Sequence, residues 1–168
     1  MLKKIIIPIL LVALLGGCRT NDVRSGDDSP RAERKTRLDR EREKNKTDDP
    51  RECAQNFTFD GSFIRGRTFK TIVFVKGVSQ SQAVKRAARY LTTSGYQINS
   101  ADENLGIISA SQTVSYGKGK TVPLNVGIEG NKGGVRVNIS FVLSGGVTSP
   151  VDAVRKEFCD IVEQIEGK

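Results

Sequence analysis

The chain has 168 residues and a formal net charge of +8 at pH 7, and it contains no histidine and no tryptophan. Without histidine it has no Ser-His-Asp or Cys-His triad, no imidazole ligand for zinc and no ordinary general base for neutral pH. Without tryptophan it has no exposed indole platform for sugars. The length is typical of a single domain.

The first 17 residues have the pattern of a cleavable secretory signal. Lys3 and Lys4 precede an apolar run over residues 5–15 that only Pro8 interrupts. About ten apolar residues are too few to span ~30 Å of hydrocarbon as a permanent anchor. We therefore predict that residues 1–17 are a signal peptide and take no part in the fold.

The signal ends in Leu15-Gly16-Gly17-Cys18, which resembles the lipobox of bacterial lipoproteins. The resemblance implies that the Cys18 thiol is diacylglycerated and that the signal is removed before it. More than one acyl chain is needed, since a single chain binds a membrane only marginally. Arg19 follows the cysteine instead of Asp, and the family rule then favours the outer membrane, with the protein facing the periplasm. An accidental cysteine after an ordinary signal is the alternative.

Residues 18–50 are predicted to be the lipidated N-terminus and a charged, flexible tether. Residues 19–50 hold two large apolar side chains, Val23 and Leu38, too few to offset the entropy of ordering. Pairs such as Glu33 and Arg37 at i,i+4 spacing make a partly helical spacer the alternative.

The excess positive charge lies in residues 51–168. This segment holds 15 basic and 10 acidic side chains, against 10 and 9 in residues 19–50. In an exported protein this charge is a poor indication of nucleic-acid binding. It fits anionic lipid, lipopolysaccharide or an acidic protein surface as a partner, and the alternative is that it serves solubility alone.

The first part of this segment predicts a strand followed by a helix. Residues 67–76 are rich in β-branched and aromatic side chains, as strands are. Ser79 with Gln82 resembles a capping box. An amphipathic helix is expected from there to Gly95, which should end it in the left-handed conformation.

Four more strands and a final helix complete the expected order. The strands are predicted at residues 96–100, 107–115, 122–129 and 135–143, and the last two alternate apolar and polar side chains. Ser149 is expected as N-cap and Pro150 as the first helical residue, before an apolar stripe that reaches Ile165. The order β-α-β-β-β-β-α predicts one α+β domain over residues 51–168: a two-layer sandwich in which two helices pack on an antiparallel sheet of about five strands.

Residues 81–111, "SQAVKRAARYLTTSGYQINSADENLGIISAS", resemble the repeated unit of BamC-type lipoproteins, the helix-grip subunit of the outer-membrane β-barrel assembly machinery. The shared features are a helix that ends at Gly95-Tyr96, a short strand, an acidic turn at Asp102 and a strand that opens at Gly106-Ile107. The resemblance implies a helix-grip-like fold. That family has two such units and this chain has one, so no role in barrel assembly is inferred.

Cys53 and Cys159 are the cysteines that remain once Cys18 is lipidated. In an oxidising compartment an even number of cysteines favours a disulfide. Cys53 precedes the first apolar residues of the domain and Cys159 adjoins the apolar stripe of the last helix. We predict a bridge between them, and two independent buried thiols are the alternative.

Lys85, Arg86 and Arg89 form a basic cluster at helical spacing. It is a candidate contact surface for an anionic partner, and a solvated helix face is the alternative. The sequence offers no nucleophile–base pair, metal-ligand cluster or cofactor loop. Gly-Lys-Thr at residues 119–121 lacks the first glycine of a P-loop, since position 114 is Val114. We expect no catalytic residues, no metal, no cofactor and no enzymatic activity.

Two functions compete for a lipid-anchored envelope protein of this kind. One is an adaptor or scaffold that binds another envelope protein through a sheet edge or a helix surface. The other is a carrier that holds a small ligand or lipid between the sheet and the C-terminal helix. A continuous apolar cavity of several hundred Å³ would favour the carrier, and its absence would favour the adaptor.

Overall fold

The computed structural model describes residues 46–113 and 119–168. The predicted signal peptide, Cys18 and the tether up to residue 45 lie outside the described residues. The elements are α2 (Glu52–Gln55), β1 (Thr58–Ser62), β2 (Gly66–Lys76), α3 (Gln80–Thr93), β3 (Gln97–Asp102), β4 (Ile107–Thr113), β5 (Thr121–Asn131), β6 (Gly134–Leu143) and α4 (Val151–Glu166).

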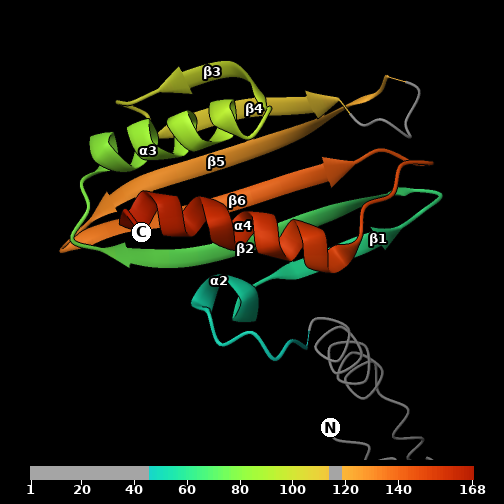
Figure 1. Cartoon of the computed structure of the whole chain (residues 1–168), viewed down its shortest axis with the longest axis horizontal. Coiled ribbons are helices and arrows are strands. Elements are labelled where there is room, and N and C mark those ends of the chain that lie inside the picture. The colour runs from blue at the N-terminus through green and yellow to red at the C-terminus, as the bar shows by residue number, and fades with distance from the viewer. Residues whose placement is uncertain (1–45, 114–118) are drawn as a thin grey trace, which may run out of the picture. The chain divides into compact units, whose positions relative to one another are not determined.

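The strands form one antiparallel sheet in the order β1-β2-β6-β5-β4-β3. The helices pack on one face of it, α3 near β3, β4 and β5, and α4 along β2 (Figure 1). Sheet and helices share a single hydrophobic core. The predicted class, an α+β two-layer sandwich of helix-grip-like form, is confirmed.

The sheet has six strands where about five were predicted, and α2 was not predicted either. The missed strand is β1, whose sequence TFDGS is short and contains Asp and Gly, two residues that are depleted in strands. Its pairing with β2, from Thr58 opposite Lys70 to Ser62 opposite Gly66, makes it a strand. A helix of four residues such as α2 is too short to show helical periodicity in the sequence.

The helix ends follow local side-chain chemistry. The Ser79 hydroxyl accepts a hydrogen bond from the Gln82 N–H, and the Gln82 side chain accepts one from the Ser79 N–H, both at 3.3 Å. Gly95, with φ of +86°, follows α3 as predicted. α4 begins one residue later than expected, because Pro150 keeps an extended ψ of 132° and is itself the N-cap residue. Ser149 therefore does not cap the helix.

The two strands with the clearest alternation bury one face. The buried side chains of β5 and β6 are Val122, Leu124, Val126, Ile128, Val135, Val137, Ile139, Phe141 and Leu143. Burying each aliphatic side chain contributes about 1.5–3 kcal/mol. This apolar face holds both long helices against the sheet.

The predicted disulfide is present and joins α2 to α4. Cys53 and Cys159 are 106 residues apart in sequence, and their Cα atoms lie 5.3 Å apart. Arg51 strengthens the same contact, because its guanidinium lies 2.6 Å from Asp49 and 2.9 Å from Glu163 of α4. The start of the domain is thus fixed to its last helix.

Candidate functional site

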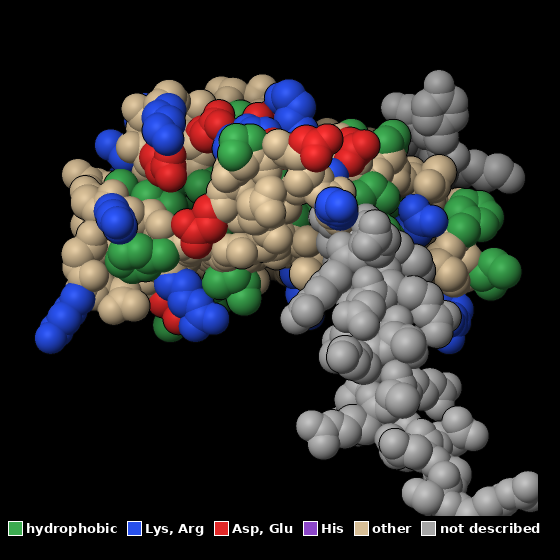
Figure 2. Space-filling model, turned by 90° about the horizontal axis from the view of Figure 1, so that it is seen from below, with side chains coloured by type: hydrophobic (Ala, Val, Ile, Leu, Met, Phe, Trp, Pro, Cys, Tyr) green, Lys and Arg blue, Asp and Glu red, His purple; other side chains and the backbone are tan. Residues whose placement is uncertain are grey.

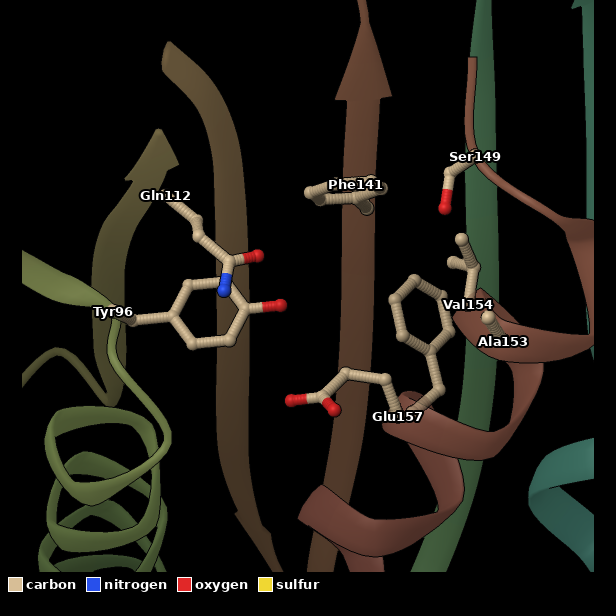
Figure 3. A pocket seen from close by; sticks show the side chains of 8 residues that line it. Tyr96, Gln112, Phe141, Ser149, Ala153, Val154 and Glu157 are labelled. Atoms are coloured by element: carbon tan, nitrogen blue, oxygen red, sulfur yellow. The ribbon is translucent and has the colours of Figure 1, made fainter. Parts of the chain in front are cut away.

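A cleft of about 180 Å³ lies between the first turns of α4 and the sheet (Figure 3). We call it the Tyr96–Glu157 cleft. It is lined by Tyr96, Gln112, Phe141, Ser149, Ala153, Val154, Glu157 and Phe158. These residues come from the connection between α3 and β3, from β4 and β6, and from α4 with the loop before it, so only the folded domain brings them together.

Two polar side chains, Gln112 and Glu157, reach the cleft from within or beside apolar patterns of the sequence. On β4, Ile108 and Ala110 are buried, and Gln112 is the next residue on the same face of the strand. On α4, Glu157 lies three residues after Val154 and one before Phe158, beside the buried stripe. Gln112 thus stands where the apolar pattern of β4 would put another core residue, and Glu157 places a carboxyl group at the edge of the apolar stripe of α4.

The polar groups of the cleft converge from opposite sides. Tyr96 extends toward α4 and Glu157 extends from α4 toward Tyr96, while Gln112 and Ser149 approach from the sheet and from the loop before α4 (Figure 3). Tyr96 is 8% exposed, and the rings of Phe141 and Phe158 are buried. The arrangement is an apolar slot with several polar groups, as in small-ligand sites.

The Glu157 carboxyl group is the charged group of this cleft. Its burial raises its pKa, Asp160 raises it further, and Lys156 and the Tyr90 hydroxyl act in the opposite direction. Its Oε1 atom is buried and has no hydrogen-bond partner among the described residues. Burial also raises the pKa of Tyr96, and Glu157 adds to that rise. Glu157 therefore places a carboxyl group with one unpaired, buried oxygen in the wall of the cleft.

A second cleft, of about 160 Å³, lies beside the disulfide between α2, β2 and the end of α4. Four of its five charged side chains pair with one another: Arg51 lies 2.9 Å from Glu163, and Lys168 lies 2.6 Å from Glu166. With these charges paired, this cleft is the weaker candidate for a binding site.

The predicted basic cluster is partly used inside the domain. The Lys85 ammonium lies 3.3 Å from the Glu103 carboxylate. Arg86 donates a hydrogen bond of 2.8 Å to the Ile165 carbonyl at the end of α4. The Arg89 side chain makes no hydrogen bond or ion pair within the described residues. On the face seen in Figure 2, basic and acidic side chains are interspersed. The cluster as an anionic-partner surface stays a prediction.

The two edges of the sheet are short or irregular. β1 has five residues and contains Gly61 at φ of +104°. β3 has six residues and a register shift between Ile98 and Ser100. Short edge strands and bulges are features that protect a sheet against the addition of a foreign strand. The hairpin turn between β1 and β2 exposes two large apolar side chains, Phe63 at 52% and Ile64 at 85%.

Residues 46–113 and 119–168 contain no group of three or more His, Cys, Asp or Glu side chains placed to hold a metal ion. No helix within them is long and apolar enough to cross a membrane.

No family model and no curated protein matches the chain. The crystal structure of Ara h 8.0201 is similar to it with a TM-score of 0.47 and 15% sequence identity, over 60% of this chain and 94% of that chain.

Proposed function

We propose that the protein is a non-enzymatic adaptor of the bacterial envelope that recognises a partner protein by admitting one of its side chains into the Tyr96–Glu157 cleft. The observation that carries the proposal is the cleft itself, about 180 Å³ in volume and lined by both aromatic rings and polar groups. The domain supplies recognition, and the segment before it supplies attachment to the membrane.

The size of the cleft favours a single side chain over a lipid. A cavity of about 150 Å³ holds one benzene ring, whereas sites for drug-sized ligands occupy about 300–1,000 Å³. The cleft, at about 180 Å³, therefore suits one ring or one short chain. A lipid carrier of the kind considered from the sequence needs more space than this.

The sheet edges support the same choice. Addition of a partner strand is opposed by the short β1 and by the bulge in β3. Insertion of a side chain under α4 needs no free edge. A carrier for a small ligand of one ring is the second candidate, favoured by the partial enclosure of the same cleft.

Membrane attachment is proposed through Cys18, on the lipobox pattern of residues 15–18. Metabolic labelling with a palmitate analogue tests it. The protein should carry the label and fractionate with the outer membrane, and a Cys18→Ser variant should carry none. Persistent labelling of that variant would remove the anchor from the proposal.

Site-specific crosslinking tests the adaptor function. A photo-reactive residue at Ala153, on the exposed rim of the cleft, should capture a defined envelope protein in intact cells. The same residue at the exposed Lys132, in the turn between β5 and β6, is the control and should not capture it. The captured protein is then purified for binding measurements.

Binding measurements with the captured protein decide between the adaptor and the carrier. An Ala153→Tyr variant, which fills the cleft, should weaken the affinity for the purified partner at least about tenfold, or 1.4 kcal/mol, while Lys132→Tyr should not change it. Unchanged affinity of Ala153→Tyr would reject the cleft as the contact. A bound small molecule in the native mass spectrum of the purified protein, displaced by Ala153→Tyr, would replace the adaptor with the carrier.

A further inference from the structure

We infer that the Tyr96–Glu157 cleft selects an organic cation, namely the ammonium or guanidinium end of a lysine or arginine side chain of the partner. This inference rests on the proposed function, because it names the group that the cleft admits. It is carried by the Glu157 carboxylate in the wall of the cleft, by the aromatic rings that line the cleft and by the absence of Lys and Arg from its lining.

The unused oxygen of Glu157 favours a ligand that donates hydrogen bonds. Oε1 is buried without a partner among the described residues, and a buried acceptor left unpaired is costly. Ionised carboxylates form their strongest hydrogen bonds with ammonium and guanidinium groups. A cation in the cleft would lie beside this carboxylate and compensate its charge.

Aromatic rings line the rest of the space. Tyr96, Phe141 and Phe158 all border the cleft, and the faces of aromatic rings attract ammonium and guanidinium groups. The same rings pack against the methylene groups of a lysine or arginine side chain. Carboxylate and rings together thus fit both parts of such a side chain.

The cleft has no cation of its own with which to bind an anion. None of its eight lining residues is Lys or Arg. The neighbouring cations on α4 are already engaged: Lys156 lies 2.6 Å from Asp160, and Arg155 pairs with Asp152 and lies over the Phe57 ring at 5.0 Å. A phosphate or carboxylate ligand would meet Glu157 without a compensating charge.

The groups around Glu157 determine how binding depends on pH. Asp160 and Lys156 on α4 and Tyr90 on α3 act on the pKa of this carboxyl group, and its charge in turn raises the pKa of Tyr96. A cation requires the ionised form of Glu157, and burial favours the protonated form. Binding of a cation should therefore weaken as the pH falls through the pKa of Glu157.

Three four-carbon probes of similar size test the charge preference on the purified full chain. They are n-butylammonium, n-butanol and n-butyrate, and binding is followed by NMR through the methyl signals of Ala153 and Val154. The ammonium should bind at least about tenfold more tightly than the alcohol, or 1.4 kcal/mol, and butyrate should bind most weakly. Glu157→Gln should remove this preference and its pH dependence, while Glu166→Gln, at the far end of α4, should preserve both.

The outcomes separate this inference from the proposed function. If butanol binds as tightly as the ammonium, or if Glu157→Gln keeps the preference, the cation selectivity is wrong and the cleft remains a binding site. If none of the three probes shifts the Ala153 and Val154 signals, the proposed use of the cleft also fails. An unchanged NMR spectrum elsewhere in the Glu157→Gln variant confirms that it folds.

The origin of the cation is tested with two further probes. N-acetyl-lysine methylamide, which presents the ammonium on a peptide backbone, should bind at least as tightly as free spermidine. Tighter binding of spermidine would contradict the inference that the cation belongs to a protein side chain, and would indicate a free polyamine as the ligand.

Discussion

Arg86 on α3 donates a 2.8 Å hydrogen bond to the main-chain carbonyl of Ile165, the buried residue at the end of α4. The last carbonyl groups of a helix have no hydrogen-bond partner within the helix. The positive charge of a guanidinium at this position is also attracted to the negative end of the helix dipole. A side chain first considered as part of a binding surface therefore joins the two long helices.

Replacing Arg86 with Met should destabilise the domain, because the Ile165 carbonyl loses its donor. A hydrogen bond to a charged group contributes about 1.5–3 kcal/mol, and the half-buried position suggests the lower end of that range. Urea unfolding measures the loss. Arg89→Met, one turn nearer the end of the helix, is the control, and an equal loss in both variants would contradict the capping role.

Opening the Cys53–Cys159 bridge should lower the unfolding free energy by up to about 4.7 kcal/mol, the chain-entropy value for a closed loop of about 100 residues. A Cys53→Ala/Cys159→Ala double variant removes the bridge without leaving free thiols. Its thermal midpoint should fall and should no longer respond to reductant. If alkylation and mass analysis of the oxidised wild-type protein find two free thiols, the bridge is absent.

Gly106→Ala should be far more harmful than Gly95→Ala, although both glycines have positive φ, of +67° and +86°. A Cβ at Gly106 would stand 1.9 Å from the carbonyl oxygen of Ile128, whereas a Cβ at Gly95 would meet nothing within 4 Å. We expect a loss of about 1–2 kcal/mol for Gly95→Ala, from backbone conformation alone, and on the order of 3 kcal/mol or more for Gly106→Ala. Chemical denaturation of both variants is the measurement, and equal losses would contradict the close approach.

Glu157 should make the domain less stable as the pH rises. Its pKa in the folded chain lies above the ordinary value of 4.5 because of burial. The folded state therefore holds this proton more tightly than the unfolded state. The contribution of Glu157 to the unfolding free energy is therefore greatest below pH 4.5. It is lost as the pH rises through the pKa that Glu157 has in the folded chain.

Glu157→Gln should remove that part of the pH dependence. Its stability relative to the wild type should therefore improve as the pH rises from about 4.5, the ordinary pKa, through the raised pKa of Glu157 in the folded chain. Urea unfolding across this range tests the slope, with Glu129→Gln, an exposed residue of β5, as the control for the loss of one carboxyl group. A wild-type-like slope in Glu157→Gln would contradict the assignment.

Much of the fold was predictable because its signals are local. The capping pair Ser79 and Gln82, the glycine after α3 and the alternation in β5 and β6 each depend on residues close together in the chain. β1 was missed because pairing with β2, and not its own composition, makes it a strand. Pro150 was misplaced by one residue because its ψ, which its sequence does not fix, remains extended.

A space between the sheet and the C-terminal helix was considered from the sequence only as the alternative, for a carrier. The residues that line the Tyr96–Glu157 cleft were not predicted, because they meet only through the order of the strands. Gln112 on an inward face and Glu157 beside an apolar stripe are the two signals that the sequence does contain. Taken separately, each is an ordinary polar residue in an amphipathic element. Only the packing of α4 against the sheet turns them into neighbours.

The covalent link between Cys53 and Cys159 also determines how the domain would carry mechanical load. A pull on the segment before Cys53 enters α4 through the disulfide, and a group held by Glu157 sits on the same helix two residues earlier. Tension between these points crosses covalent bonds and roughly half a turn of helix. It bypasses the hydrogen bonds between the strands, so the sheet stays folded under a force that would peel it apart if the bridge were open.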